Sequence, residues 1–158
     1  VQALAFTPPS VRLRFISEGY ETATLRRLAD RLGVGDRVEF LGRVPRDEMF
    51  KMLNETAGVV FTGLREEGGC ALSEAMLVGA PVIVLGHGGA RLIAESNTDP
   101  TRVAIVDPAG RTETARRMGA AMAAFSANPS QATGSYLDQE SVERGLNQAV
   151  LDAIATQA

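Results

Sequence analysis

Short apolar runs alternate with longer amphipathic segments along the chain. The short runs are the length of β-strands, whereas the longer segments repeat their apolar residues every three or four positions, as helices do. Gly33 and Gly79 stand where helices should end, and Pro45 stands near the first turn of another. We predict strands at 11–16, 37–41, 58–62, 81–85 and 102–106, helices at 21–33, 45–54, 69–78, 88–95, 112–125 and 139–155, and a polar loop at 126–135.

This alternation predicts an α/β fold, a Rossmann-like parallel sheet with helices on both faces. The run at 58–62 is apolar throughout, which is typical of a strand that is covered on both faces. Ligands of such sheets bind outside the carboxyl ends of the strands. We therefore expect a site among the loops at 42–44, 63–69 and 86–89, which follow strands.

The composition adds a few constraints. The chain has 158 residues, the size of one domain, and its net charge of −3 gives no reason to expect binding to nucleic acid. Cys70 is the only cysteine and His87 the only histidine, so an internal disulfide, a cysteine cluster and a multi-histidine metal site are excluded. We expect no metal and no cofactor. No membrane-spanning run and no signal peptide is recognisable, which predicts a cytoplasmic protein.

Residues 59–89 carry the candidate chemistry and read VVFTGLREEGGCALSEAMLVGAPVIVLGHGG. Gly68 and Gly69 would let a ligand approach the backbone, and the free amide groups of the helix that starts there can bind an anion. Glu74 lies one turn inside that helix and can accept hydrogen bonds from a vicinal diol such as a ribose. Glu66 can reach the hydroxyl groups of a second sugar. The segment thus offers amide groups that can bind phosphate, flanked by two carboxylates that can accept hydrogen bonds from diols. This arrangement matches a sugar nucleotide.

Each of these features also has a plain structural interpretation. Adjacent acids such as Glu66 and Glu67 are commonly a solvated pair, and glycines before a helix can simply form a turn. Cys70 could be an activated thiol at a helix N-terminus, but no histidine base is near it in sequence, so we expect a small packing residue. His87 either touches phosphate or acceptor or is a solvated loop histidine.

The stretch resembles the signature of a known enzyme family, the GT-B-fold retaining glycosyltransferases of family 4 (glycosyl transferases group 1), in their C-terminal domain. The family motif is E-x7-E followed by A-M, a G-x-P-V-V strand and a G-G loop, and Glu66 and Glu74 have that spacing. The resemblance runs from about Val11 to Phe125. The other matching segments are Leu32-Gly33-Val34, the run DRVEFLGRV that ends at Val44, Ala75-Met76, Gly79-Ala80-Pro81-Val82-Ile83 and Gly88-Gly89.

The resemblance implies that residues 1–158 form a single nucleotide-sugar-binding domain, the C-terminal half of a GT-B fold. The family transfers a sugar from a nucleoside-diphosphate sugar to an acceptor with retention, usually without a bound metal. Glu66 would bind the transferred sugar and be the catalytic residue, and Glu74 would hold the ribose. The remaining donor contacts would come from the backbone of Val44 at the base, from amide groups at Gly68, Gly69 and Cys70, and from the Gly88-Gly89 loop at the reaction centre.

Three departures from the family pattern bear on specificity. Thr62-Gly63 replaces the usual Pro-Ser, Gly68 replaces a Phe, and Arg91 replaces a Glu after the G-G loop. These changes affect the choice of sugar and base but not the fold. A related GT-B epimerase and a non-catalytic sugar-nucleotide-binding or interaction module are the alternatives. A phosphorylase would need a pyridoxal phosphate lysine, and Lys51, the only lysine, is poorly placed for it.

The resemblance also implies that parts of the family's enzyme precede Val1. The family's sheet has strand order 3-2-1-4-5-6, in which the runs at 11–16 and 58–62 correspond to the second and fourth strands. Residues 1–7 would then be the tail of the helix after strand one. The first strand, the basic residues that clamp the diphosphate, and the N-terminal acceptor domain would all lie upstream, and that domain could hold the protein at the inner face of a membrane.

A missing central strand would leave unpaired N–H and C=O groups on both neighbouring strands. Three arrangements would resolve this. The chain is a portion of a longer polypeptide, the second and fourth strands pair directly, or an edge is borrowed from another molecule.

Overall fold

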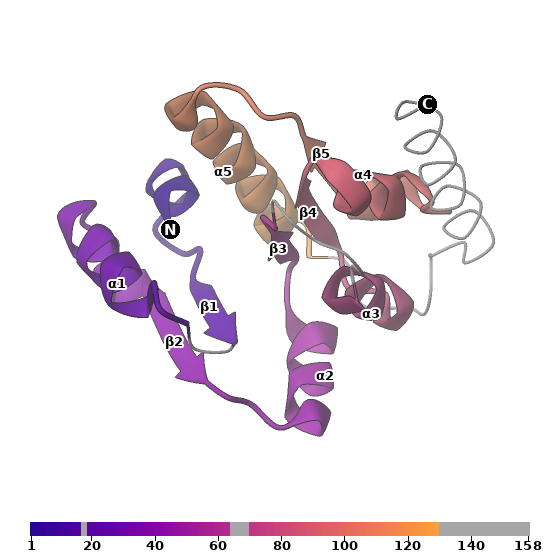
Figure 1. The fold of residues 1–158 in the computed structure, drawn as a ribbon, viewed down its shortest axis with the longest axis horizontal. Coiled ribbons are helices and arrows are strands. Elements are labelled where there is room, and N and C mark those ends of the chain that lie inside the picture. The colour runs from indigo at the N-terminus through magenta and orange to yellow at the C-terminus, as the bar shows by residue number, and fades with distance from the viewer. Residues whose placement is uncertain (17–18, 64–69, 130–158) are drawn as a thin grey trace, which may run out of the picture.

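The computed structural model describes residues 1–16, 19–63 and 70–129 (Figure 1). No helix in these ranges is both long enough and apolar enough to cross a membrane. The predicted alternation of strands and helices is confirmed there, while the helix predicted at 139–155 lies outside them. The strands are β1 (Leu13–Ile16), β2 (Val38–Gly42), β3 (Val59–Phe61), β4 (Val82–Leu85) and β5 (Val103–Val106); the α-helices are α1 (Thr22–Arg31), α2 (Arg46–Glu55), α3 (Cys70–Val78), α4 (Gly88–Glu95) and α5 (Arg111–Ala127); and the 3-10 helices are η1 (Gln2–Phe6), η2 (Gly35–Arg37) and η3 (Pro100–Arg102).

The strands form two parallel sheets. β1 pairs with β2, and β4 lies between β3 and β5. Both orders agree with the order expected from the family resemblance. Within the parts of the chain that the structure describes, β1 and β3 are not paired with each other. Direct pairing of these two strands, one of the three arrangements considered above, is therefore not what the chain adopts there.

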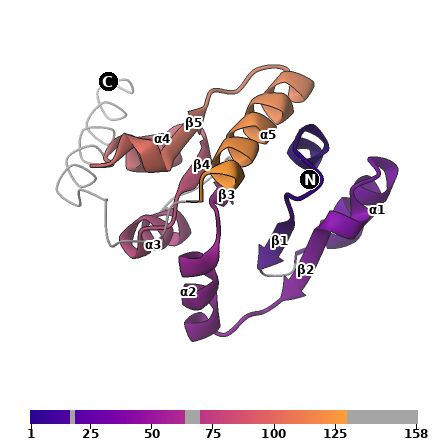
Figure 2. The same ribbon diagram turned by 180° about the vertical axis from the view of Figure 1, so that it is seen from behind.

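Helices cover the three-stranded sheet on both faces, as the strand–helix alternation predicts (Figures 1 and 2). β4 shows this most clearly because its residues alternate between two cores. Val82 and Val84 pack in a cluster with Leu72 of α3, whereas Ile83 packs on the opposite side in a cluster with Met118 of α5. All three β4 residues are at most 1% exposed. The fold is thus an α/β fold with parallel sheets and helices on both faces.

The two-stranded sheet is tied to η1 and α1 by polar and aromatic contacts. Arg37 donates hydrogen bonds from Nη2 to the carbonyl of Leu4 and from Nη1 to the carbonyl of Pro8, each at 2.8 Å. The rings of Phe15 and Phe40 stack with their centroids 4.8 Å apart, and the guanidinium of Arg26 lies over the Phe40 ring. Arg37 thereby fastens the N-terminal segment to β2.

Several element ends differ slightly from the predicted ones, and backbone chemistry explains them. Gly33 has a φ of 67° and follows the α1 C-cap, Leu32, so it lies one position beyond the C-cap predicted for it. Gly79 ends α3 with a φ of 94°, as predicted. Pro45 is the N-cap of α2 and not a residue of its first turn.

The prediction that the third strand is covered on both faces is wrong in part. Val59, Val60 and Phe61 of β3 are only half-buried, in contrast to the neighbouring β4. β4 has a paired strand on each side, whereas β3 is paired on the β4 side. The run at 58–62 is therefore apolar throughout, although the strand that it forms is only half-buried.

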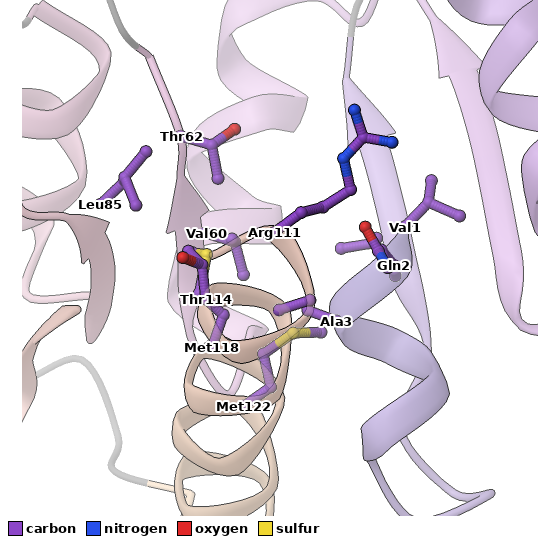
Figure 3. A pocket seen from close by; sticks show the side chains of 12 residues that line it. Val1, Gln2, Ala3, Val60, Thr62, Leu85, Arg111, Thr114, Met118 and Met122 are labelled. Atoms are coloured by element: carbon purple, nitrogen blue, oxygen red, sulfur yellow. The ribbon is translucent and has the colours of Figure 1, made fainter. Parts of the chain in front are cut away.

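An apolar cavity of about 240 Å³ lies between the two sheets (Figure 3). β1 contributes Leu13, β3 contributes Val60, and α5 contributes Met118 and Met122. This is the position between the second and fourth strands of the expected order. The described residues that line it are Val1, Gln2, Ala3, Leu13, Val60, Thr62, Leu85, Arg111, Thr114, Ala115, Met118 and Met122.

Candidate functional site

The carboxyl ends of β3, β4 and β5 lie along one edge of the sheet because the three strands are parallel and in register. The segment that leads to α3 follows β3, the loop at 86–89 follows β4, and Asp107 follows β5. The predicted site residues Gly88 and Gly89, which follow β4, therefore lie at this edge. Glu66, Gly68 and Gly69 lie outside the described residues, so their predicted roles stay predictions.

The first turns of α3 carry the two predicted donor-binding residues of this segment that the structure describes. Leu72, Ala75 and Met76 are fully buried, which fixes the face of the helix that packs on the core. Cys70 begins the helix and is exposed. The expectation that Cys70 is a packing residue is therefore wrong, because the buried face of α3 starts two positions later. Glu74 keeps 30% of its side chain exposed at the border of that face.

Glu74 is held by a residue that the sequence analysis did not single out. Arg46 Nη2 donates a hydrogen bond to Glu74 Oε1 at 2.7 Å, which joins the first residue of α2 to α3 across 28 positions of the chain. The guanidinium also lies 5.3 Å from the centroid of the Phe50 ring, one helical turn further along α2. A guanidinium that contacts an aromatic ring and a carboxylate at the same time is held in a defined position.

Val44 lies close to this pair along the chain. β2 ends at Gly42, whose φ of 70° is a left-handed conformation that favours glycine. Val44 follows half-buried, and Pro45 caps α2 directly before Arg46. The predicted base contact, Val44, is thus two positions from the residue that binds the predicted ribose contact, Glu74. The structure brings these two predicted residues together through Arg46.

The glycine-rich loop after β4 turns directly into α4. Gly88 is the first residue of α4 and has a φ of 54°, and Gly89 follows it in the first turn. His87 is exposed in the N-cap position, in an extended conformation. Gly86 is closely packed, because an added Cβ would lie 2.9 Å from Ile105 and 3.0 Å from Asp107. A side chain at position 86 would therefore clash with its neighbours, which explains the glycine there.

Arg91 is neutralised by two carboxylates. Its Nη1 donates to Asp107 Oδ1, and its Nε donates to Glu95 Oε1 at 2.8 Å. The hydrogen bond to Asp107 and the charge of that carboxylate, reinforced by Glu95, raise the pKa of Arg91 above its usual value. The family resemblance places a Glu at this position. This chain has Arg91 there, and its positive charge is balanced by Asp107 and Glu95. Their combined charge makes Arg91 a weak attractor of a diphosphate.

Two concave regions do not coincide with the predicted donor site. The cavity between the sheets is lined by none of the predicted donor-binding residues that the structure describes. A larger, open concavity of about 500 Å³ is lined by Thr24, Arg27, Asp30 and Arg31 of α1 alone, away from the strand ends. In the described ranges there is also no group of three or more histidine, cysteine or acidic residues that could hold a metal ion.

Comparisons with known proteins identify a family and a similar fold. The family model for glycosyl transferases group 1 matches residues 2–122. The solved structure of sucrose-phosphate synthase from Thermosynechococcus elongatus is similar with a TM-score of 0.54 and 18% identity, which supports the fold. The alignment covers 98% of this chain and 42% of that protein, so the chain spans less than half of that synthase. Among curated proteins no match was found.

Proposed function

The chain belongs to the family of glycosyl transferases group 1, and from this we propose that it is the donor-binding half of a sugar transferase. In this proposal a two-domain enzyme transfers a hexose-type sugar from a nucleoside-diphosphate sugar to an acceptor, with retention of anomeric configuration. This half binds the donor, and an N-terminal domain binds the acceptor. The family membership supports sugar transfer in general, and the roles of individual residues rest on the site.

The observation that carries the proposal is the joining of α2 and α3 through Arg46 and Glu74. This contact brings the segment of Val44, which we assign to the base, next to Glu74, which we assign to the ribose. Val44 follows the carboxyl end of β2, and such strand ends are where ligands of parallel α/β sheets bind. A base contact and a diol acceptor at one place are what a nucleoside needs.

The proposed reaction depends on charge stabilisation. The bond between the sugar and the diphosphate breaks, so negative charge grows on the leaving diphosphate and positive charge on the anomeric carbon. Amide groups at the start of α3, at Gly68, Gly69 and Cys70, would stabilise the diphosphate. Glu66 would bind the hydroxyl groups of the sugar, and the Gly88-Gly89 loop would border the reaction centre.

The two-domain organisation is supported by the gap in the sheet order. A strand between β1 and β3 would pair with both, cover the half-buried β3 and fill the apolar cavity that Leu13 and Val60 line. We propose that a longer polypeptide supplies this strand, together with the basic residues for the diphosphate. We therefore expect the 158-residue chain alone to bind donor weakly and to transfer no sugar.

A binding panel tests the proposal. Thermal shift of the full-length protein with uridine, guanosine and adenosine diphosphate sugars should show stabilisation by one nucleotide class. Glu74→Ala should then weaken the bare nucleoside diphosphate and the intact donor alike, by about 1–3 kcal/mol for a lost charged hydrogen bond. Glu66→Ala should leave the bare nucleotide binding unchanged and reduce turnover.

The two acidic residues serve as controls for each other. Equal weakening of the bare nucleotide by both variants would contradict the assignment of Glu74 to the ribose and Glu66 to the sugar. An absence of stabilisation by every nucleoside diphosphate would contradict donor binding itself.

A further inference from the structure

Arg46 contacts Glu74, the proposed ribose contact, and the proposed function gives Arg46 itself no role in binding. Its Nη2 lies 2.7 Å from Glu74 Oε1. Its side chain is 71% exposed, whereas that of Glu74 is 30% exposed, so the cation lies on the solvent side of a partly covered carboxylate. Exposed ion pairs usually contribute little to stability. A role of Arg46 should therefore be sought in binding.

The contact joins two different helices. Arg91 with Glu95, and Arg117 with Glu113, instead join neighbouring turns of one helix. Arg46 is the first residue of α2, and Glu74 lies one turn inside α3. The pair therefore links the start of α2 to α3, in addition to ordering the two side chains.

A glutamate has three rotatable side-chain bonds, and ordering such a side chain costs binding energy unless it is ordered beforehand. Arg46 supplies that order from a defined position, since it also rests on the ring of Phe50 at 5.3 Å. A single hydrogen bond to Oε1 leaves the carboxylate with further lone pairs, which can accept hydroxyl groups. Arg46 can therefore hold Glu74 without blocking a diol.

We propose that Arg46 is a positioning residue for the nucleotide ribose: it holds the Glu74 carboxylate ready for the vicinal hydroxyl groups and so sets the preference for ribose over 2′-deoxyribose. This inference rests on the proposed function, because it requires that Glu74 binds the ribose. Arg46 acts through Glu74, so its contribution must vanish when Glu74 can no longer serve as the acceptor.

The test is calorimetry on the full-length protein with uridine, guanosine and adenosine diphosphate, each in the ribo and the 2′-deoxy form. Arg46→Ala should weaken the preferred ribonucleotide roughly fivefold to tenfold. It should weaken the deoxy form less, so that the ratio of the two dissociation constants falls. Arg46→Lys should restore part of the ratio. Adding Arg46→Ala to Glu74→Ala should cause no further loss, because the two residues act as one unit.

Arg14→Ala is the matched control, because Arg14 also forms an exposed ion pair, with Glu39 at 3.1 Å, but on the two-stranded sheet. It should leave all dissociation constants unchanged. Three results overturn the inference while donor binding stands: an unchanged ratio in Arg46→Ala, an equal loss for both nucleotide forms, or a loss that persists in the Glu74→Ala background. The latter two would identify a direct contact with phosphate. If the wild-type protein binds no nucleoside diphosphate, the proposed function fails and the inference fails with it.

Discussion

The two sheets of the molecule have the same parallel pairing but differ in how completely they are buried. In the three-stranded sheet, β4 has a partner on each side, and Val82, Ile83 and Val84 are at most 1% exposed. In the two-stranded sheet, β1 alternates between half-buried and exposed residues, and Ile16 is 36% exposed. The three-stranded sheet is buried on both faces, whereas the two-stranded sheet combines a smaller set of buried residues, among them Leu4 and Ala29, with polar contacts such as those of Arg37.

This difference indicates where stability and where binding reside. The proposed donor site is built on α3, whose inner face is anchored by Leu72 and Met76 in the core of the three-stranded sheet. The side of the site that faces β1 and β2 is connected to it through the α2 segment and Arg46. The predictions below test this contrast between the two regions.

The largest expected effect comes from the same substitution in each region. Leu72 is fully buried among residues of the three-stranded core, so Leu72→Ala should cost about 2–5 kcal/mol of unfolding free energy. Leu13 is half-buried and lines the cavity, so Leu13→Ala removes less buried area and should cost less than about 2 kcal/mol. Urea denaturation of both variants measures the difference. Equal costs would show that the two regions are packed equally well.

A smaller effect is expected from two arginines that bind backbone carbonyls. Arg102 is 8% exposed and donates to the carbonyl of Gly79 at 2.7 Å and to Asp99 at 3.0 Å, so Arg102→Met should cost about 1.5–3 kcal/mol. Arg37 is half-buried, so Arg37→Met should cost about 0.5–1.5 kcal/mol. Thermal unfolding monitored by circular dichroism gives both values. A larger loss in Arg37→Met would mean that its tie to η1 supports more than the two-stranded sheet.

The periodicity of the sequence predicted the element order and most element ends, because apolar runs and glycine positions are local signals. Gly79, for example, ends α3 as predicted, since a left-handed φ at that point requires no knowledge of the rest of the fold. The same reasoning overestimated the burial of β3, because periodicity reports the composition of a strand and not which partners it has. Cys70 was misjudged for a related reason: the buried face of α3 is set by Leu72 and its neighbours.

The candidate site was predictable only in part. The spacing of Glu66 and Glu74 is a sequence signal, and Glu74 lies in α3, where it pairs with Arg46. Its partner Arg46 lies 28 positions away on another helix, and no local pattern marks it. The two carboxylates around Arg91 were missed for the same reason, since Asp107 comes from beyond the next strand.

The most direct measurement is amide hydrogen exchange of the full-length protein with and without its preferred nucleoside diphosphate. The account predicts that binding slows exchange in the first turns of α3, at Cys70 to Glu74, and at the start of α4, at Gly88 and Gly89. Exchange at Ala3 and Met118, which line the cavity between the sheets, should not change. Protection at the cavity without protection at the start of α3 would contradict the assignment of the donor site to the edge of the three-stranded sheet.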